Sequence, residues 1–276
     1  MYNIRKTLFV SDLDGTLLRS DGKLSDFSLA TINKLIASGM NISFATARSL
    51  YMAQKVIGDV DQRIPLILHN GAFIQRPSGE YLRKSVFTVD EVNMIKTLLD
   101  EYSVEPIVYS IHDEREIYRF DQARVTPEEQ RFLDARPGDP RKFPVGHERL
   151  WEDHETIFYV TCIGRKDHLL PAYEKLSGFT VIFQPDFYSK DQWLEILPEN
   201  SGKAQATKAL SEALGCDRIV VFGDAENDLS NFGLADEAYA VANAVDQIKN
   251  AATAIIGSND EDGVAKFLLG AFEDSV

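Results

Sequence analysis

The chain has 276 residues, of which 44% are hydrophobic and 26% are charged. A chain of this length can bury one large core or two smaller ones, so a globular protein is expected. The formal net charge of −14 disfavours nonspecific attraction to nucleic acid or to an anionic membrane surface, because both need basic patches. We therefore expect neither nucleic acid nor membrane as a partner.

Two cysteines, Cys162 and Cys216, lie far apart in the chain and have no metal-ligand spacing around them. Neither a disulfide framework nor a zinc site is indicated, and reduced thiols are typical of intracellular proteins. The apolar run before Ser11 is too short for a signal peptide, and no apolar stretch is long enough to span a bilayer. These features predict a cytoplasmic protein and leave its oligomeric state open.

Two aspartates follow a short apolar run near the start of the chain. Residues 8–10 read as a buried strand, and Asp12 and Asp14 come directly after it, one residue apart. Carboxylates this close repel each other, a cation would relieve the repulsion, and oxygen ligands suit Mg²⁺. The alternative is a strand that ends in a polar turn, because Asp-Gly is common in turns.

The next segments alternate between helix and strand. A helix is predicted over 25–38, a strand over 41–45, a second helix ending at Gly58 and a strand over 65–68. This alternation indicates a parallel sheet, in which ligands bind beyond the carboxyl ends of the strands.

Polar residues follow the second and third of these strands. Thr46 and Arg48 come after the second strand, and Asn70 and Gly71 come after the third. We take Arg48, Asn70 and Gly71 as candidate substrate contacts at the shared edge. The alternative role for Thr46 is a helix N-cap.

The middle of the chain has a different character. A helix is predicted over 90–102, strands over 107–111 and 158–163, and a helix start at Thr126 within a charged, proline-dotted stretch. This mixed α+β pattern indicates an independent module.

The parallel pattern is expected to resume at the strand 193–196, followed by a helix over 203–214. Lys203 lies in the first turn of that helix, where the dipole favours anions, so an anion held there would explain the lysine. The alternative is a lysine that faces solvent.

A further strand, 218–222, leads into Asp224, Asn227 and Asp228. This layout repeats the opening of the chain, and Asp228, four residues after Asp224, is placed to support the same cation. An acidic cluster that caps a helix is the alternative.

Together these residues resemble the motifs of the haloacid dehalogenase superfamily of phosphohydrolases. The four motifs match Asp12-Leu13-Asp14-Gly15-Thr16, Thr46 in Ala-Thr-Ala-Arg, Lys203, and Gly223-Asp224 with Asn227-Asp228. Residues 70–72, 193–196 and 257–264 resemble the Cof-type group of this superfamily, which carries a large cap between the second and third motifs. The sequence departs from the family pattern at Gly202-Lys203-Ala204, because in family members the lysine of this motif is often followed by glycine.

The resemblance implies an α/β fold. It consists of a Rossmann-like parallel-sheet core, residues 1–82 plus 191–276, and an inserted α+β cap, residues 83–190. By analogy the cap closes over the site and reads the leaving group. Its candidate contacts are Tyr109, Arg119, Arg165, Asp186 and Lys190.

The resemblance also implies the chemistry. Asp12 would attack phosphorus and form an aspartyl-phosphate, while Asp14 would act as general acid and then as general base. Thr46 and Lys203 would bind the phosphate oxygens.

A magnesium ion is the cofactor that the resemblance implies. It would be held by Asp12, the main-chain carbonyl of Asp14 and Asp224, with Asn227 and Asp228 orienting these ligands.

These features predict a Mg²⁺-dependent phosphatase of small phosphorylated metabolites, with sugar phosphates as the expected class. The alternatives are a phosphomutase or phosphotransferase of the same fold, and a non-catalytic sugar-phosphate sensor. A signalling receiver domain is disfavoured, because there the acidic pair precedes the phosphorylated aspartate, whereas here the second acidic cluster closes the chain.

Overall fold

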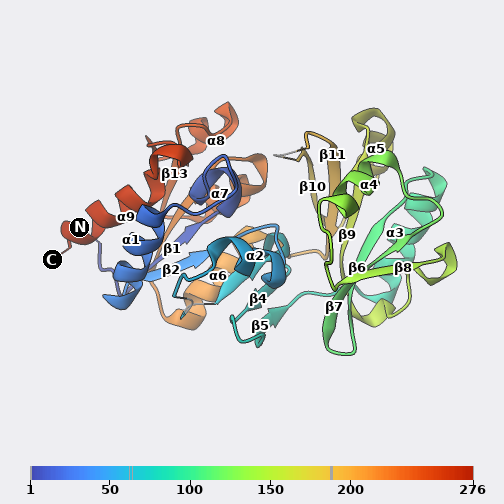
Figure 1. Ribbon diagram of the computed structural model, residues 1–276, viewed down its shortest axis with the longest axis horizontal. Helices are drawn as coiled ribbons and strands as arrows, with labels where there is room; N and C mark the ends of the chain where they lie inside the picture. The colour runs from blue at the N-terminus through green and yellow to red at the C-terminus, as the bar shows by residue number, and fades with distance from the viewer. Residues whose placement is uncertain (1, 62, 64, 187–188, 276) are drawn as a thin grey trace. The chain divides into compact units, whose positions relative to one another are not determined.

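The structure is a computed structural model that describes residues 2–61, 63, 65–186 and 189–275 (Figure 1). The chain divides into two compact units. The core unit contains the chain up to Lys84 and from Gly202 onward, and the inserted unit is Ser85–Ser201.

A five-stranded parallel sheet forms the centre of the core unit. Its strand order is β14 (Ala254–Ile256), β13 (Glu237–Val241), β12 (Arg218–Gly223), β1 (Thr7–Ser11) and β2 (Asn41–Phe44). The residues of β1 are buried throughout, as expected for a central strand covered on both faces. Ser11 pairs with Phe222 on one side and Phe44 on the other, so the residues that follow these strands emerge at one edge.

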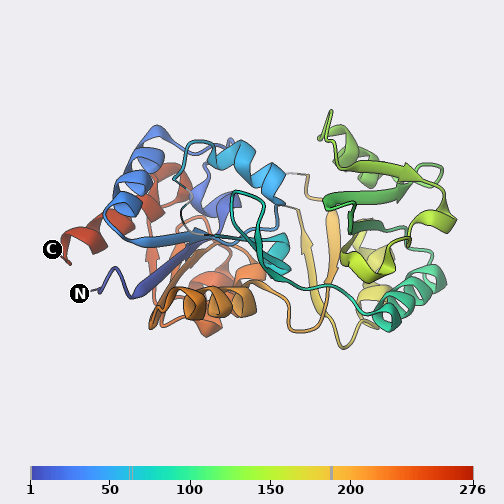
Figure 2. The ribbon, with the colours of Figure 1, turned by 90° about the horizontal axis from the view of Figure 1, so that it is seen from below.

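Helices cover both faces of this sheet. Helices α1 (Asp26–Ala37) and α9 (Gly263–Glu273) pack together on one face, and α6 (Lys203–Leu214) and α7 (Leu229–Leu234) pack together on the other (Figure 2). The unit also contains helices α2 (Leu50–Ile57) and α8 (Asp246–Ala251). Helix α1 begins after the predicted cap Ser25, whose hydroxyl accepts a hydrogen bond from Ser28 N, and α6 ends at Gly215 in the left-handed region.

A small antiparallel sheet, β3 (Leu66–Leu68), β4 (Phe73–Gln75) and β5 (Tyr81–Lys84), completes the core unit. A parallel bridge between Ala45 and Ile67 joins β3 to the end of β2. The residues after β3 therefore also reach the shared edge.

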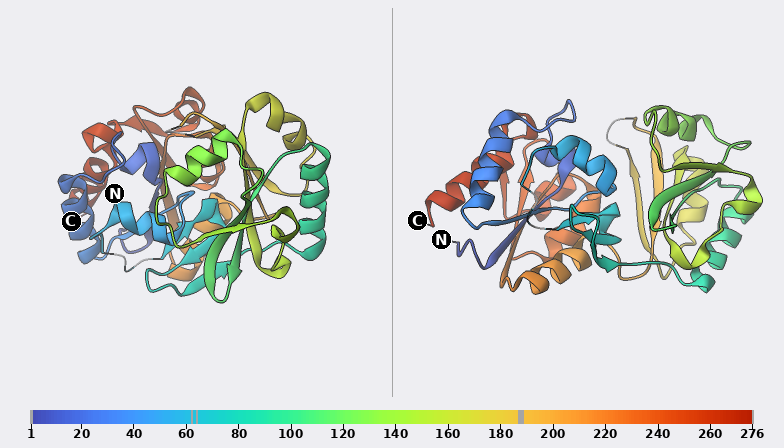
Figure 3. Two further views of the ribbon diagram at one scale, coloured as in Figure 1. Left: turned by 45° about the vertical axis from the view of Figure 1, so that its right-hand side comes forward. Right: turned by 60° about the horizontal axis from the view of Figure 1, so that its bottom comes forward.

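The inserted unit has a six-stranded sheet of its own (Figure 3). The order is β10 (Thr180–Pro185), β11 (Gln192–Leu197), β9 (Ile157–Gly164), β6 (Ile107–His112), β7 (Arg115–Asp121) and β8 (Lys142–Val145). Neighbouring strands are antiparallel except for β7 and β8.

Three helices accompany this sheet. Helices α3 (Val89–Glu101) and α5 (Lys166–Tyr173) bury Val92, Ile95 and Leu169 against apolar side chains of the strands. Helix α4 (Pro127–Asp134) begins at Thr126, as predicted, with a capping box to Glu129.

The prediction that residues 193–196 resume the parallel core is wrong. This segment is β11, which pairs antiparallel with β9 and β10 in the inserted unit, so the chain returns to the core unit only at Gly202 rather than at residue 191. The strand is central in its sheet, and a central antiparallel strand reads as an apolar run just as a parallel strand does. The charged stretch after residue 113 also contains β7 and β8, which the periodicity did not predict.

Among the described residues, no helix combines the length and apolar composition needed to cross a bilayer.

The cap of α3 gives a test of local stability. Thr88 accepts from Glu91 N through its hydroxyl and Glu91 accepts from Thr88 N, so Thr88→Ala leaves the N–H of Glu91 without its partner. We expect the free energy of unfolding to fall by about 1 kcal/mol in chemical denaturation. Thr97→Ala, at an exposed position within the same helix, is the control and should cost nothing, because alanine is the better helix former. Equal losses in both variants would contradict this role of the cap.

Candidate active site

Acidic side chains follow two neighbouring strands at the shared edge of the core sheet. Asp12 comes after β1 and donates its N–H to Phe222 O, which keeps it beside β12. Asp224 comes directly after β12. Carboxylate oxygens of Asp12, Asp224 and Asp228 lie within 4.8 Å of one another, and all three residues are buried. The fold therefore brings together acidic residues from opposite ends of the chain.

Lys203 joins two of these carboxylates. Its Nζ donates to Asp12 Oδ1 and to Asp228 Oδ1, each at 2.7 Å, and its side chain is 1% exposed. The lysine is the first residue of α6, and Gly202 precedes it with φ of 123°, a backbone conformation that L side chains rarely adopt. The solvent-facing alternative for this lysine is excluded.

Asp224 and Asp228 are fixed by local hydrogen bonds. Thr16 Oγ1 donates to Asp224 Oδ1 at 2.7 Å, and the N–H groups of Asp224 and Ala225 donate to Asp228 Oδ2 at 3.0 and 3.3 Å. Both oxygens of Asp228 thus have protein partners. Within the described residues, no hydrogen bond reaches Oδ2 of Asp12 or of Asp224.

The buried charges in this cluster do not balance. Burial raises the pKa of Asp12, and the charges of Asp228 and Asp224 push it in the same direction against Lys203. Burial also raises the pKa of Asp224 to about 7, with a further contribution from Asp228. Burial alone would lower the pKa of Lys203, but its two aspartate partners outweigh burial and raise it, so the lysine stays charged. Three carboxylates share one ammonium group.

This donor set fits a divalent cation. Asp12 and Asp224 supply carboxylate oxygens, hard ligands of the kind Mg²⁺ prefers, and a cation would offset the excess negative charge. The observation supports a metal site without identifying the metal.

Asp14 forms an ion pair with Arg48 instead of Lys203. Arg48 donates through Nε to Asp14 Oδ2 at 2.7 Å and through Nη2 to Asp14 Oδ1 at 2.6 Å, which is a two-pronged ion pair. Asp14 lies in the short helical segment Leu13–Leu17, where Gly15 has a φ of 80°. The sequence placed Arg48 at this edge but did not predict its pairing with Asp14.

The other predicted residues of the edge are linked through the loop after β3. Thr46 is buried, its Oγ1 accepts from Arg48 N, and its carbonyl accepts from Asn70 N. Asn227 Nδ2 donates to Asn70 Oδ1 at 3.1 Å. Helix α2 is capped by Ser49 and not by Thr46, so the N-cap role for Thr46 is excluded.

Gly71 lies against the start of α6. A Cβ atom at this position would be 2.1 Å from Gly202 O and 2.7 Å from Lys203 N, and the φ of Gly71 is 102°. Only glycine fits, so Gly71 helps to set the position of Lys203.

Two asparagines complete the site: Asn243 was missed from the sequence, and Asn259 lies in the segment 257–264 but was given no role there. Asn243 Nδ2 donates to Gly15 O at 2.7 Å, and Asn259, whose N–H donates to Asn243 Oδ1, donates through Nδ2 to Leu18 O. They fix the loop that carries Asp14. The available signal for Asn243 was its position just after β13, at the edge where the other polar residues lie.

The predicted contacts in the inserted unit have different environments. Arg119 is buried and donates to Ser110 Oγ and Asp153 Oδ2, so it serves the packing of its own unit. Arg165 is exposed and pairs with Asp167. A substrate role for Tyr109, Asp186 and Lys190 stays a prediction.

The fold and the acidic site are those of a hydrolase, and comparisons with known proteins identify the family. The family described as haloacid dehalogenase-like hydrolase matches residues 9–268, and the chain belongs to it.

Similar proteins agree with this assignment. The 5-amino-6-(5-phospho-D-ribitylamino)uracil phosphatase YwtE of Bacillus subtilis is 28% identical, over 93% of this chain and 95% of its own length. An HMP-PP phosphatase of Escherichia coli is 25% identical, over 86% of this chain and 85% of its own. The crystal structure of TM0651 from Thermotoga maritima has a TM-score of 0.76 and 25% identity, over 97% of each chain. The predicted superfamily, the fold class and the enzyme class, a phosphoric monoester hydrolase, are confirmed.

The close approach at Gly71 gives a test of the site. Gly71→Ala places a Cβ against the backbone of Gly202 and Lys203, so we expect a loss of about 1–3 kcal/mol in unfolding free energy and a loss of activity. Gly79→Ala is the matched control, because φ is also positive there, at 94°, yet nothing lies within 4 Å of its Cβ. If the two variants behave alike in denaturation and turnover, the contact with Gly202 does not position Lys203.

The raised pKa of Asp224 predicts how pH affects cation binding. Burial raises the pKa of Asp224 from its ordinary value of 3.8 to about 7, so the free energy of unfolding of the cation-free protein falls as pH rises through this range. A divalent cation needs the ionised carboxylate, so the increase in melting temperature caused by Mg²⁺ should be larger at about pH 8 than at about pH 6. Asp224→Asn should remove most of this increase, and an equal Mg²⁺ effect at both pH values would contradict the assignment.

Proposed function

We propose that this hydrolase is a metal-dependent phosphatase of small phosphorylated metabolites that uses Asp12 as its nucleophile. The supporting observation is the buried pair in which Lys203 donates to Asp12 Oδ1 at 2.7 Å, with Asp224 in the same cluster. The ammonium group orients the carboxylate and leaves Oδ2 for attack. A buried carboxylate held in one orientation is what covalent catalysis requires.

The first half of the reaction transfers the phosphoryl group to the protein. Asp12 Oδ2 forms a bond to phosphorus, the bond from phosphorus to the leaving oxygen breaks, and Asp14 gives that oxygen a proton. In the second half, Asp14 takes a proton from the water that attacks phosphorus. The aspartyl-phosphate bond breaks, and inorganic phosphate and the free Asp12 carboxylate are released.

The pair between Arg48 and Asp14 must open for this chemistry. Both oxygens of Asp14 accept hydrogen bonds from the Arg48 guanidinium group, which favours the ionised carboxylate, so Asp14 can donate a proton only after Arg48 moves to another partner. A phosphate dianion is such a partner. We propose that Arg48 contacts the substrate phosphate and thereby frees Asp14.

The remaining predicted site residues would bind the phosphate group or the metal ion, or hold these ligands in position. Thr46 and Lys203 would hold phosphate oxygens, while Asn70 and Gly71 would line the substrate. Asp12, Asp224 and the main-chain carbonyl of Asp14 would hold Mg²⁺, which supplies positive charge that offsets the charge of the phosphate. Asp228 and Asn227 would position these groups, because both oxygens of Asp228 already accept hydrogen bonds.

The substrate class is supported by the relatives and by the composition. One relative is named for a phosphorylated ribitylaminouracil and another for HMP-PP, both small phosphorylated compounds, and we infer the same class here, with sugar phosphates foremost. The net charge of −14 argues against nucleic acid or membrane as a partner. Cys162 and Cys216 are free thiols, which supports a cytoplasmic location.

A screen of phosphorylated metabolites with Mg²⁺, read out as released phosphate, tests this function. Asp12→Asn should lower kcat on the best substrate by at least about a thousandfold, because an amide cannot take the phosphoryl group. Asp59→Asn removes an exposed carboxylate from the same unit and should leave turnover unchanged.

Three other results of this screen would contradict the proposed function or the role of Asp12. Retained turnover in Asp12→Asn would overturn the nucleophile assignment. Transfer of the phosphoryl group to a sugar acceptor, with no phosphate released when the acceptor is absent, would indicate a phosphotransferase, and no turnover with or without an acceptor would indicate a sensor.

A further inference from the structure

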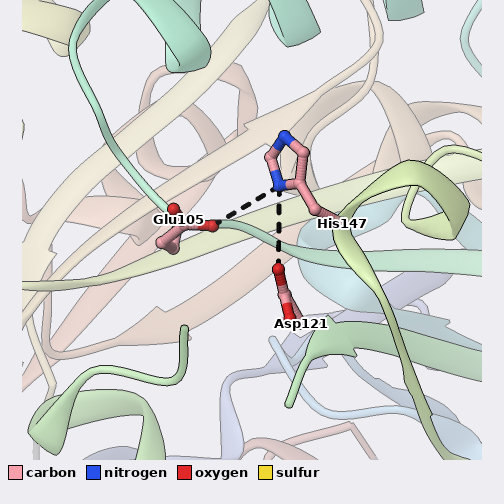
Figure 4. A group of neighbouring side chains, drawn as sticks. All are labelled: Glu105, Asp121 and His147. Atoms are coloured by element: carbon pink, nitrogen blue, oxygen red, sulfur yellow. Dashed lines mark ion pairs between the residues drawn. The ribbon is translucent and has the colours of Figure 1, made fainter. Parts of the chain in front are cut away.

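Three side chains with metal-ligating atoms converge in the inserted unit. Glu105 lies just before β6, Asp121 is the last residue of β7, and His147 follows β8 at the start of the turn His147–Arg149 (Figure 4). Strands β6, β7 and β8 are neighbours in the sheet, so the three residues come from adjacent strand ends. The ligand atoms lie within 4.8 Å of one another.

The distances fit ligands that share an ion better than direct hydrogen bonds. His147 Nδ1 is 3.9 Å from Glu105 Oε2 and 3.9 Å from Asp121 Oδ2, as the dashed lines of Figure 4 mark. This separation is too long for a hydrogen bond. Two ligands on one metal ion with bonds of about 2 Å are separated by somewhat less than this, so a small inward movement would complete the site.

Both ring nitrogens of His147 have charged neighbours. Arg124 Nη1 is 3.4 Å from His147 Nδ1, and since arginine only donates hydrogen bonds, this contact favours a lone pair on Nδ1. On the far side of the ring, Nε2 is 3.5 Å from Asp100 Oδ1. A carboxylate behind the far nitrogen is the arrangement typical of histidines that bind metal through the near one.

The two carboxylates also point into the cluster. Glu105 Oε2 is buried and has no hydrogen-bond partner among the described residues. Asp121 Oδ1 accepts from Ala123 N at 2.9 Å, which leaves Oδ2 directed toward His147, and the Asp121 side chain is only 5% exposed. Two carboxylate oxygens and an imidazole nitrogen thus converge, and the negative charge of the carboxylates favours a cation there.

Arg124 supplies part of that charge, and it can be displaced. Its guanidinium group lies 3.2 Å from Glu105 Oε1 and 3.6 Å from Asp121 Oδ2, but its side chain is 53% exposed. An exposed arginine held by ion pairs of this kind loses little when it moves into solvent. A metal ion can therefore take the place of this arginine.

We propose that Glu105, Asp121 and His147 form a second metal site, which takes a divalent transition metal ion such as Zn²⁺. One imidazole nitrogen and two carboxylate oxygens are a ligand set that Zn²⁺ accepts, whereas Mg²⁺ prefers oxygen alone. Bound there, the ion would cross-link the ends of three neighbouring strand segments and stabilise the inserted unit.

Equilibrium dialysis of the full chain with Zn²⁺, in a large excess of Mg²⁺ to occupy the carboxylates of the core unit, tests the site. The wild type should bind one Zn²⁺, and His147→Ala should weaken this binding by at least about tenfold. Arg124→Ala should tighten it several-fold, because a competing cation is removed. His168→Ala, which removes an exposed histidine of the same unit, is the control and should have no effect.

Thermal denaturation gives a readout that does not depend on activity. Zn²⁺ should raise the melting temperature of the wild type and of His168→Ala but not of His147→Ala. If His147→Ala is misfolded, Glu105→Gln, which preserves side-chain shape, replaces it in both measurements. The proposal is overturned if the ligand variants bind Zn²⁺ as tightly as the wild type, or if neither the wild type nor Arg124→Ala binds it.

Discussion

The core unit depends on one buried ammonium group. Lys203 Nζ lies between Asp12 and Asp228, residues 191 and 25 positions away in the chain, and its side chain is almost completely buried. A charge removed from water to this extent is tolerated only when it is paired and hydrogen-bonded. The pairing joins the first residue of α6 to the end of β1 and to the start of α7. The geometry of the acidic cluster and the position of α6 are therefore fixed by the same contacts.

The same constraint determines where the chain re-enters the core unit. The inserted unit ends at Ser201, and the next residue, Gly202, places its carbonyl against Gly71 before Lys203 enters the cluster. Two glycines are needed, because both have a positive φ that would strain any other residue, and a Cβ on Gly71 would also collide with the backbone of Gly202. An insertion of more than a hundred residues is accommodated because the re-entry point is fixed by local contacts of the core unit.

Much of the edge could be predicted from the sequence, because parallel strands that end at the same level bring the following residues together. That rule alone placed Asp12, Thr46 and Asp224 correctly. It could not predict the pairing of Arg48 with Asp14 or the bond from Asn243 to Gly15, since both depend on side-chain directions across long separations in the chain. It also assigned residues 193–196 to the wrong sheet, because apolar composition reports burial on both faces and not the identity of the neighbouring strands.

The two acidic clusters differ in how their positive charge is held. In the core unit the lysine is buried and bonded to two carboxylates, so it cannot leave, and any further cation must add to it. In the inserted unit the arginine is half exposed, so another cation can replace it. A fixed lysine keeps Asp12 in one orientation, as its proposed role as nucleophile requires, whereas an exchangeable arginine suits the proposed binding of a metal ion by Glu105, Asp121 and His147. Burial of the counter-charge, rather than the number of carboxylates, is thus what distinguishes the two clusters.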